Sequence, residues 1–262
     1  PYPASQSVNA FDTAFSALTP DGRAYLVGDL NGDTLDDVLL VTWTPQKPLE
    51  AGIFFGRVEG FPLGLNLAAA DVIINGEADF SQLAAYVPSV AANAPGPLDV
   101  NGDGLADLLI GDPNANDRAG RAYVLLGRRV WPAQIALADA DWRFSPSRTI
   151  AFGGSVASAG DVDGDGLTDI LVGAMIDTVN YETAYLYLGR ERGIPAVQSR
   201  LYGRFCAGTC PSPLIPNLAG LGDTNGDGLS DILLASYQAV WLINGRPKSD
   251  WPATSLAADV SS

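Results

Sequence analysis

A nine-residue pattern occurs four times in the chain, starting at residues 29, 99, 161 and 223. Every copy has Asp at position 1, Asn or Asp at position 3, Asp at position 5, Leu at position 7 and Asp at position 9. Alternate side chains therefore offer oxygen atoms to one point, and roughly six to eight hard oxygen ligands suit Ca²⁺. Ordinary solvated turns would not repeat four times in register, so the pattern predicts four calcium loops.

We expect the side chains at positions 1, 3, 5 and 9 and the backbone carbonyl at position 7 to bind the metal, with the position 9 carboxylate bidentate. The predicted ligands, for up to four Ca²⁺, are Asp29, Asn31, Asp33, Leu35, Asp37, Asp99, Asn101, Asp103, Leu105, Asp107, Asp161, Asp163, Asp165, Leu167, Asp169, Asp223, Asn225, Asp227, Leu229 and Asp231. We expect calcium that is mainly structural, because no repeat is singled out.

Position 6 distinguishes the first copy from the others. Gly104, Gly166 and Gly228 supply a residue that adopts a left-handed turn at no steric cost. Thr34 replaces this glycine in the first copy, and a β-branched residue at positive φ is strained. The first site is therefore predicted to be the weakest or to be distorted.

The residues after each loop exclude an EF-hand, which has Glu at position 12 and lies between helices. Position 12 is apolar in every copy, at residues 40, 110, 172 and 234. It lies in a short β-rich apolar run that is typical of a buried strand. No sustained helical period occurs, so the sequence predicts an all-β fold with the loops in β-hairpins.

The repetition extends beyond the loops. A third apolar run ends in Gly-Arg at residues 56–57, 127–128, 189–190 and 245–246. A bulky residue before proline follows at 61–62, 131–132, 194–195 and 251–252. Units of about 65 residues with several strands each are typical of propeller blades. We predict one β-propeller domain, 1–262, with repeats at approximately 16–80, 81–148, 149–204 and 205–262 plus 1–15.

Repeat three contains Phe152-Gly153, then Gly160-Asp161, then Val172-Gly173-Ala174, and resembles the FG-GAP repeat of integrin α-subunit propellers. The resemblance covers nearly the whole chain, although the GAP part is clear only in repeat three. It implies calcium sites on the lower face of the propeller. It also implies that protein ligands, where there are any, bind at the opposite face.

The two ends of the chain bear on blade number. Residues 255–260 match 66–71, and residues 7–15 match the outer strand at 72–80, so the two ends together would complete one blade. A closed four-bladed ring, with the N-terminal strand completing the last blade, is the preferred interpretation. Two chains that close one eight-bladed ring, or a fragment cut at a repeat boundary, fit the same pattern.

The net charge of −15 is largely explained by the loops, which contain 13 of the 30 acidic residues at positions 1, 3, 5 and 9. Four Ca²⁺ would reduce the charge to −7, and nucleic acid is not an expected partner. Cys206 and Cys210 are expected to form a local disulfide in an oxidising, extracellular setting, the alternative being two unpaired thiols. Zinc is not expected, since the chain has no His.

Two classes of function remain. The first is a non-catalytic extracellular or cell-surface interaction and adhesion module that binds a protein or glycan. The alternative is a lectin, or a propeller domain of a carbohydrate-active or lipid-active enzyme. Catalysis is disfavoured because no imidazole base exists, although Asp112, Asp177 and Glu182 are unassigned acids.

Other residues have two interpretations each. The Gly-Arg pairs are interpreted as exposed turns rather than an anion-binding ring, and the Trp residues as core rather than sugar-stacking groups. No signal peptide, membrane-spanning run or N-glycosylation sequon occurs, so we expect a mature or trimmed secreted chain without membrane insertion. The Arg and Ala content points to a bacterial source.

Overall fold

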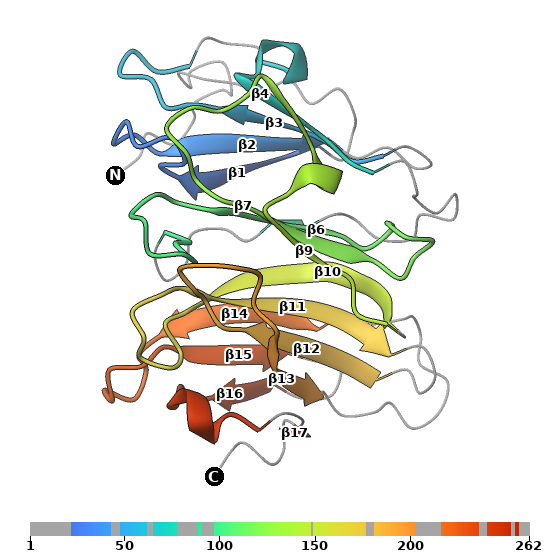
Figure 1. Ribbon diagram of the computed structural model, residues 1–262, viewed down its shortest axis with the longest axis vertical. Helices are drawn as coiled ribbons and strands as arrows, with labels where there is room; N and C mark the ends of the chain where they lie inside the picture. Colours follow the sequence, from blue (N-terminus) through green and yellow to red (C-terminus); the bar gives the residue numbers. More distant parts are fainter. Residues whose placement is uncertain are drawn as a thin grey trace, which may run out of the picture.

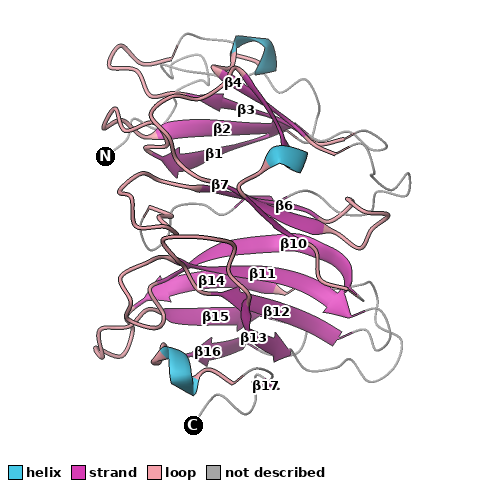
Figure 2. Cartoon of the chain, viewed as in Figure 1, coloured by secondary structure: helices cyan, strands magenta, loops and turns pink. Residues whose placement is uncertain are grey.

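The computed structural model describes residues 22–42, 48–61, 65–77, 89–90, 97–147, 149–176, 181–202, 216–235, 240–252 and 255–256. Within these residues the chain forms β-strands and three short 3-10 helices, at Leu67–Ala69, Leu137–Asp139 and Lys248–Asp250, and no α-helix (Figure 2). The all-β prediction is confirmed.

The strands form four sheets. The first sheet contains β1 (Arg23–Gly28), β2 (Asp37–Thr42), β3 (Glu50–Phe54), β4 (Val72–Asn75) and β8 (Gln134–Ala136). The second contains β5 (Ser89–Val90), β6 (Leu108–Asp112), β7 (Arg121–Leu125) and β9 (Trp142–Phe144). The third contains β10 (Thr149–Gly160), β11 (Asp169–Ile176), β12 (Tyr181–Tyr187), β13 (Val197–Tyr202) and β17 (Ser255–Leu256). The fourth contains β14 (Asn217–Gly222), β15 (Asp231–Ala235) and β16 (Val240–Ile243).

The first sheet lies at one end of the longest axis and the second follows it, whereas the third and fourth pack against each other and overlap at the other end (Figure 1). Neighbouring strands are antiparallel except for β8 and β17, and each predicted calcium loop lies between the first two strands of its repeat. The sheets of the described residues do not close into a ring (Figure 1). Residues 1–15, which were predicted to complete the last blade, lie outside the described residues.

Two strands cross from one repeat to the sheet of the preceding one. Strand β8 runs parallel to β4, with Ile73 opposite Gln134, and β17 runs parallel to β13, with Leu201 opposite Ser255. Both crossing strands follow the bulky-residue-proline pair of their repeat. Ser255 and Leu256, the described part of the C-terminal segment, thus add a fifth strand to the third sheet, whereas the matched segment 66–71 contains the 3-10 helix Leu67–Ala69.

The core lies between the sheets, and alternate residues of a strand face opposite neighbours. On β11, Ile170 and Val172 belong to the apolar cluster shared with the second sheet, whereas Leu171 belongs to the cluster shared with the fourth. Because both faces of an interior strand are buried, its sequence is continuously apolar rather than alternating. This explains the apolar runs that follow the loops.

Two of the tryptophans that could have stacked on a sugar are instead buried. Trp142 and Trp251 are each only 4% exposed. Trp131 packs on the cluster between the first two sheets, and its Nε1 donates a hydrogen bond to the carbonyl of Leu30 at 3.1 Å. Trp241 is partly buried against the last cluster. The core interpretation of these residues is confirmed.

Candidate metal-binding loops

The position 1 carboxylate organises the backbone of each loop. In the third loop, Asp161 Oδ1 accepts hydrogen bonds from the N–H groups of Gly164 at 2.7 Å and Asp165 at 3.2 Å, and Oδ2 accepts one from Gly166 at 2.8 Å. The other three loops have the same bonds, with distances between 2.6 and 3.2 Å. The four loops thus share one hydrogen-bonded frame.

The position 9 carboxylate has a structural role that the sequence pattern did not reveal. Asp169 is fully buried, and its two oxygens accept hydrogen bonds from the N–H groups of Val162 at 2.8 Å and Gly189 at 2.7 Å. The equivalent residues in the other loops, Asp37, Asp107 and Asp231, accept the same pair of bonds. Position 9 therefore ties each loop to the Gly-Arg pair after the third long strand of its repeat.

Burial at position 9 opposes ionisation in the first three loops, whereas in the fourth loop hydrogen bonds from Thr224 and Gly245 together outweigh burial and lower the pKa of Asp231. Burial raises the pKa of Asp169 to about 8, although the N–H groups of Gly189 and Val162 act in the opposite direction. The same cause raises the pKa of Asp107 to about 7 and that of Asp37 to about 6. A divalent cation beside these carboxylates would favour their ionised forms.

The glycine of each Gly-Arg pair is required by close contact. A Cβ atom on Gly189 would lie 2.7 Å from Leu167 Cβ and 2.7 Å from the carbonyl oxygen of Thr168. The corresponding contacts to the position 7 leucine are 2.4, 2.6 and 2.6 Å for Gly56, Gly127 and Gly245. The glycine thus lets the strand end lie against the loop, where its N–H reaches the position 9 carboxylate.

In three of the four pairs the arginine packs on the aromatic residue that precedes proline, whereas Arg190 donates to the carbonyl of Ile194 at 3.4 Å. The guanidinium carbon of Arg128 lies 5.0 Å from the centre of the Trp131 ring, and that of Arg246 lies 5.1 Å from the centre of the Trp251 ring. Arg57 lies over Phe61 in the same way, at 5.3 Å. Arg57 and Arg128 also pair with Asp71 and Asp141. These arginines therefore hold the segment after the third strand in place, and their interpretation as turn residues rather than an anion-binding ring stays a prediction.

Position 6 has the left-handed conformation in every loop, as predicted. The φ angles are 82°, 87° and 88° at Gly104, Gly166 and Gly228, and 73° at Thr34. The N–H of Thr34 still donates to Asp29 Oδ2 at 2.7 Å, so the first loop keeps the common backbone frame. It is not distorted in this respect, and its weaker calcium binding stays a prediction.

A second glycine in each loop was missed in the sequence, although it occupies position 4 in all four copies. Gly32, Gly102, Gly164 and Gly226 have φ angles of 79°, 75°, 81° and 82°. At the first three, a Cβ would lie 2.7–3.0 Å from Cδ2 of the position 7 leucine in the next repeat. Its presence in every copy was the signal that could have identified it.

Backbone hydrogen bonds join each loop to the next repeat. The N–H groups of Ala106 and Arg128 in repeat two donate to the carbonyls of Asp29 and Leu30 in loop one, both at 2.9 Å. The same two bonds join repeat three to loop two, and repeat four to loop three, at 2.8–2.9 Å. The loops therefore lie in a row along one side of the molecule (Figure 1).

The third loop brings carboxylates together most closely. Asp161, Asp163 and Asp169 each offer an oxygen, and these oxygens lie within 4.8 Å of one another. In the other loops the position 3 Asn donates its Nδ2 to the position 5 Asp at 2.9–3.0 Å. Asp163 has no such donor, and its pKa is raised by burial and then by the charge of Asp165. The third loop is the clearest candidate for a divalent cation.

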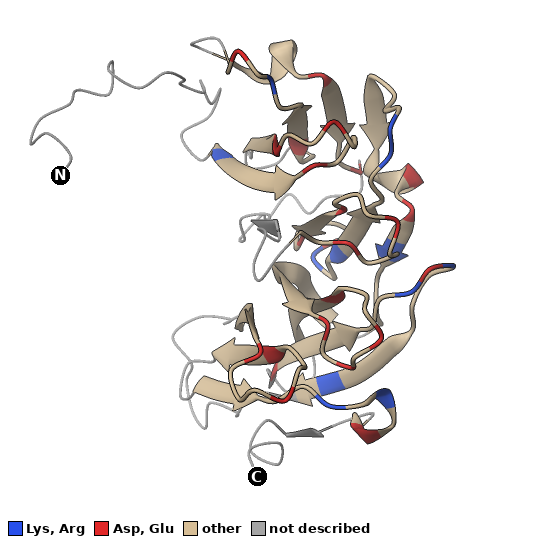
Figure 3. Ribbon diagram, turned by 90° about the vertical axis from the view of Figure 1, so that its left-hand side faces the viewer, with Lys and Arg blue, Asp and Glu red and all other residues tan. Residues whose placement is uncertain are grey.

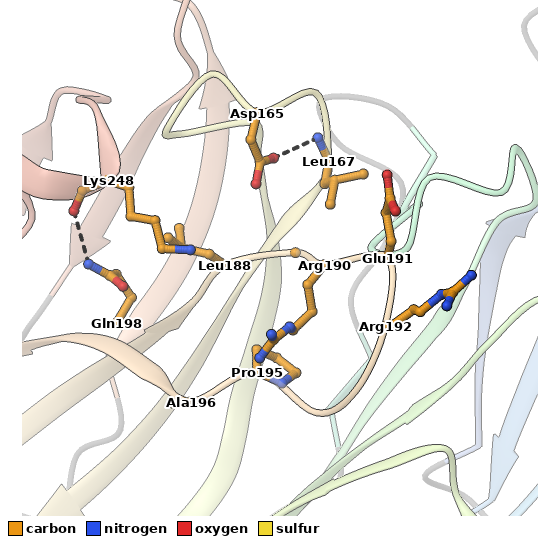
Figure 4. A pocket seen from close by; sticks show the side chains of 11 residues that line it. Asp165, Leu167, Leu188, Arg190, Glu191, Arg192, Pro195, Ala196, Gln198 and Lys248 are labelled. Carbon is orange, nitrogen blue, oxygen red and sulfur yellow. Dashed lines mark hydrogen bonds between the residues drawn. The ribbon is translucent and has the colours of Figure 1, made fainter.

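A hollow of about 620 Å³ lies beside the third loop (Figure 4). Its lining includes the acids Asp165 and Glu191 and the cations Arg190, Arg192 and Lys248. Residues of the third and fourth repeats line the hollow. The two repeats are joined there by a hydrogen bond from Gln198 Nε2 to the carbonyl of Lys248 at 3.1 Å. Charges of both signs give it the character of a polar surface hollow rather than that of a paired-carboxylate site.

The remaining predicted residues are placed as follows. Asp112 and Glu182 are buried, whereas Asp177, Cys206 and Cys210 lie outside the described residues.

Acidic residues recur along the series of sheets in the view onto the loop side (Figure 3). None of the helices in the described ranges is long and apolar enough to span a membrane.

Comparison with known proteins agrees with this geometry. The FG-GAP repeat family model matches residues 91–125 and 152–187, in the second and third repeats. Integrin alpha-V of Gallus gallus is 31% identical over 238 residues, which cover 87% of this chain and 20% of that protein. Integrin alpha-4 of Xenopus laevis is 30% identical over 179 residues, 65% of this chain and 16% of that protein.

Integrin alpha-E of Mus musculus is also 30% identical, over 193 residues that cover 64% of this chain and 15% of that protein. The chain thus spans a fifth or less of the length of these curated relatives. Together with the series of sheets, these matches fit a propeller-like fold. The chain belongs to the integrin-α-like family of FG-GAP repeat proteins.

Proposed function

We propose that this chain is a calcium-binding, integrin-like β-propeller domain that acts as an extracellular interaction and adhesion module, with calcium in a mainly structural role. The observation that carries the proposal is the third loop, where three carboxylate oxygens lie within 4.8 Å of one another in a frame shared by all four loops. Oxygen-only ligands at this density suit Ca²⁺.

Calcium would act on two contacts of the frame. A bound ion would offset the repulsion among the carboxylates at positions 1, 3 and 9 of the third loop. It would also hold the position 9 carboxylate, which already joins the loop to the N–H of Gly189. Calcium would therefore fix the hairpin to the end of the third long strand. The free energy of calcium binding would then add to the free energy of unfolding of the domain.

The finer architecture is part of the proposal. The four sheets would be four blades, with repeats at approximately 16–80, 81–148, 149–204 and 205–262 plus 1–15. The last sheet has three strands, and residues 1–15 would supply the outer strand of a blade of this kind. Up to four Ca²⁺ would bind at the 20 predicted ligand residues.

The binding role is supported by the chemistry of the chain and by its relatives. No His is present, and the charges around the hollow beside the third loop are mixed. A ligand, either protein or glycan, would bind at the face opposite the loops. An extracellular or cell-surface location accords with the relatives, which are integrin α-subunits by name.

The proposal is tested by thermal unfolding of the wild type, Asp165→Ala and Asp139→Ala, each in calcium and in chelator. Asp139 is exposed and lies outside the loops, so its variant controls for the loss of one carboxylate. Calcium should stabilise the wild type and the control, and stabilise Asp165→Ala less. Equal losses for Asp165→Ala in both buffers would show that Asp165 acts through turn formation.

A further inference from the structure

The arginine of the Gly-Arg pair has a carboxylate partner in each of the first two repeats. Arg57 Nη2 donates to both carboxylate oxygens of Asp71 at 2.9 Å, and Arg128 pairs with Asp141. Each of these carboxylates also accepts a backbone N–H from the residue that follows the third strand of its repeat, at 2.9 Å. An aspartate therefore neutralises and positions the arginine in both repeats.

The third repeat lacks this carboxylate. Gln198 occupies the same place in the sheet, because the next residue, Ser199, lies opposite Leu186. In the first two repeats the residue after the aspartate lies opposite the matched residues of the third strand, Ile53 and Val124. Gln198 is neutral, so the arginine of the third repeat has no carboxylate at this position.

The third repeat also lacks the aromatic partner. Phe61 and Trp131 lie against the arginines of the first two repeats, whereas Ile194 precedes the proline in the third. The Arg190 side chain donates one long hydrogen bond, from Nη1 to the carbonyl of Ile194 at 3.4 Å. Among the residues that the structure describes, Arg190 forms no ion pair. Its guanidinium thus keeps N–H donors for another partner.

The hollow of about 620 Å³ beside the third loop lies at this altered position, because Arg190 and Gln198 both line it. Lys248 of the fourth repeat lines it as well, and it too forms no ion pair within the described ranges. Figure 4 shows the Lys248 side chain extending toward Leu188 and that of Arg190 extending toward Pro195. Two cations from adjacent repeats therefore line one hollow.

The chemistry of the lining indicates what this hollow can bind. A guanidinium takes a carboxylate through paired N–H donors, and a carboxylate is the group that the matched arginines hold. Leu188, Pro195 and Ala196 offer apolar contact, and no aromatic ring that could stack on a sugar is among the lining residues. Asp165 and Glu191 also line the hollow and would repel a polyanion. One or two carboxylates beside small apolar groups fit these properties.

We infer that the hollow binds an acidic peptide segment of a partner protein, with an Asp or Glu carboxylate of that segment on Arg190 and Lys248 as the second cation. The carboxylate takes the part that Asp71 and Asp141 play within the first two repeats. The net charge of −15 does not prevent this contact, because salt screens charges beyond roughly 8 Å under physiological conditions.

This site goes beyond the proposed function, since it lies on the loop side and not on the face opposite the loops. It also does not depend on calcium, because Arg190, Gln198 and Lys248 are not predicted metal ligands. Calcium in the third loop would offset the charge of Asp165, which lines the hollow, and would thereby strengthen the binding of an acidic peptide.

NMR titration of the full chain tests the inference, with calcium in excess over peptide so that chelation by the peptide has no effect. The probe is the capped peptide Ala-Asp-Ala-Asp-Ala, and Ala-Asn-Ala-Asn-Ala is its uncharged control. The acidic peptide should bind saturably and shift the signals of Arg190 and Gly189, and the control peptide should not. Glucuronate, a sugar acid without the peptide chain, should bind more weakly than the acidic peptide.

Three variants locate the site. Arg190→Gln removes the main cation and should weaken peptide binding at least about tenfold. Gln198→Asp restores within the chain the carboxylate of the first two repeats, so it should occupy Arg190 and weaken binding as much. Arg23→Gln is the matched control, because Arg23 is exposed on β1 in the first sheet, and it should bind like the wild type. Thermal unfolding checks that each variant is folded.

Several results would overturn the inference. These are a wild type that does not bind the acidic peptide, equal binding of the two peptides, and equal losses in Arg190→Gln and Arg23→Gln. Full binding by folded Gln198→Asp would show that the missing carboxylate is not what the peptide supplies. Tighter binding of glucuronate than of the acidic peptide would assign the hollow to a sugar acid instead.

Discussion

The first and third loops share one backbone frame and differ at four of their nine positions, of which positions 3 and 6 bear on cation binding. Both wind around the position 1 carboxylate with the same set of N–H donors. The first has Asn31 at position 3 and Thr34 at φ 73°, whereas the third has Asp163 and Gly166. The comparison teaches that the frame tolerates either pair of residues, because the backbone hydrogen bonds to the side chains at positions 1, 3, 5 and 9 are the same in both loops. The affinity of each loop for a cation should then rise with the negative charge at position 3 and fall with the backbone strain at position 6.

The largest expected effect is loss of the position 9 anchor, which both loops share. Asp169→Ala leaves the N–H groups of Val162 and Gly189 unsatisfied and buried. The free energy of unfolding should fall by about 2–4 kcal/mol, even in chelator. Denaturant unfolding in chelator measures it, and Asp37→Ala should cost a similar amount. A loss seen only in calcium would mean that the anchor acts through the metal.

The second effect separates the loops by metal binding. Asp165→Ala in the third loop should remove about 2.7 kcal/mol of calcium stabilisation when calcium is at a hundredfold excess over Kd. Asp33→Ala in the first loop should remove less, because that site is predicted to be weaker. Thermal unfolding at fixed calcium compares the two variants. A greater loss for Asp33→Ala would reverse the predicted order of the sites.

The third effect converts the third loop to the side-chain pattern of the first at position 3. Asp163→Asn supplies an amide that could donate to Asp165, as Asn31 donates to Asp33 at 3.0 Å. The loop should become more stable without metal and bind calcium about tenfold more weakly, since one ligand charge is removed. Calcium titration checks the affinity, and unfolding in chelator checks the stability. Unchanged affinity would show that charge at position 3 is unimportant.

The smallest effect concerns strain at position 6 of the first loop. Thr34→Gly removes the Cβ from a left-handed residue and should raise the free energy of unfolding by about 0.5–1 kcal/mol. Thr34→Ala keeps the Cβ and is the matched control, which should not be stabilised. If both variants are equally stable, the backbone at Thr34 is not strained.

Several features of the structure could be predicted because they depend on short stretches of sequence. The loop pattern predicted position 6 at positive φ, and the apolar runs predicted the strands β11 and β15 directly after their loops. The recurrence of Trp131 and Trp251 before proline predicted that they pack in the core. In each case one repeat could be checked against the others.

The features that could not be predicted depend on residues distant in sequence. The bond from Gly189 to Asp169 spans 20 residues, and that from Thr168 to the carbonyl of Asp99 spans an entire repeat. The sequence marked Gly189 and Arg190 as a recurring pair, but not as the partner of position 9. The crossing of Ser255–Leu256 to the third sheet was likewise hidden, since a matched segment does not reveal its neighbour.

A calorimetric titration of the metal-free chain with Ca²⁺ tests the central claim most directly. The account predicts saturable binding of up to four ions, with the site at Asp161–Asp169 tighter than that at Asp29–Asp37. Repetition with Asp165→Ala should remove the tightest site and leave the others. Absence of calcium binding by the folded wild type, or full stoichiometry with unchanged affinities in Asp165→Ala, would contradict it.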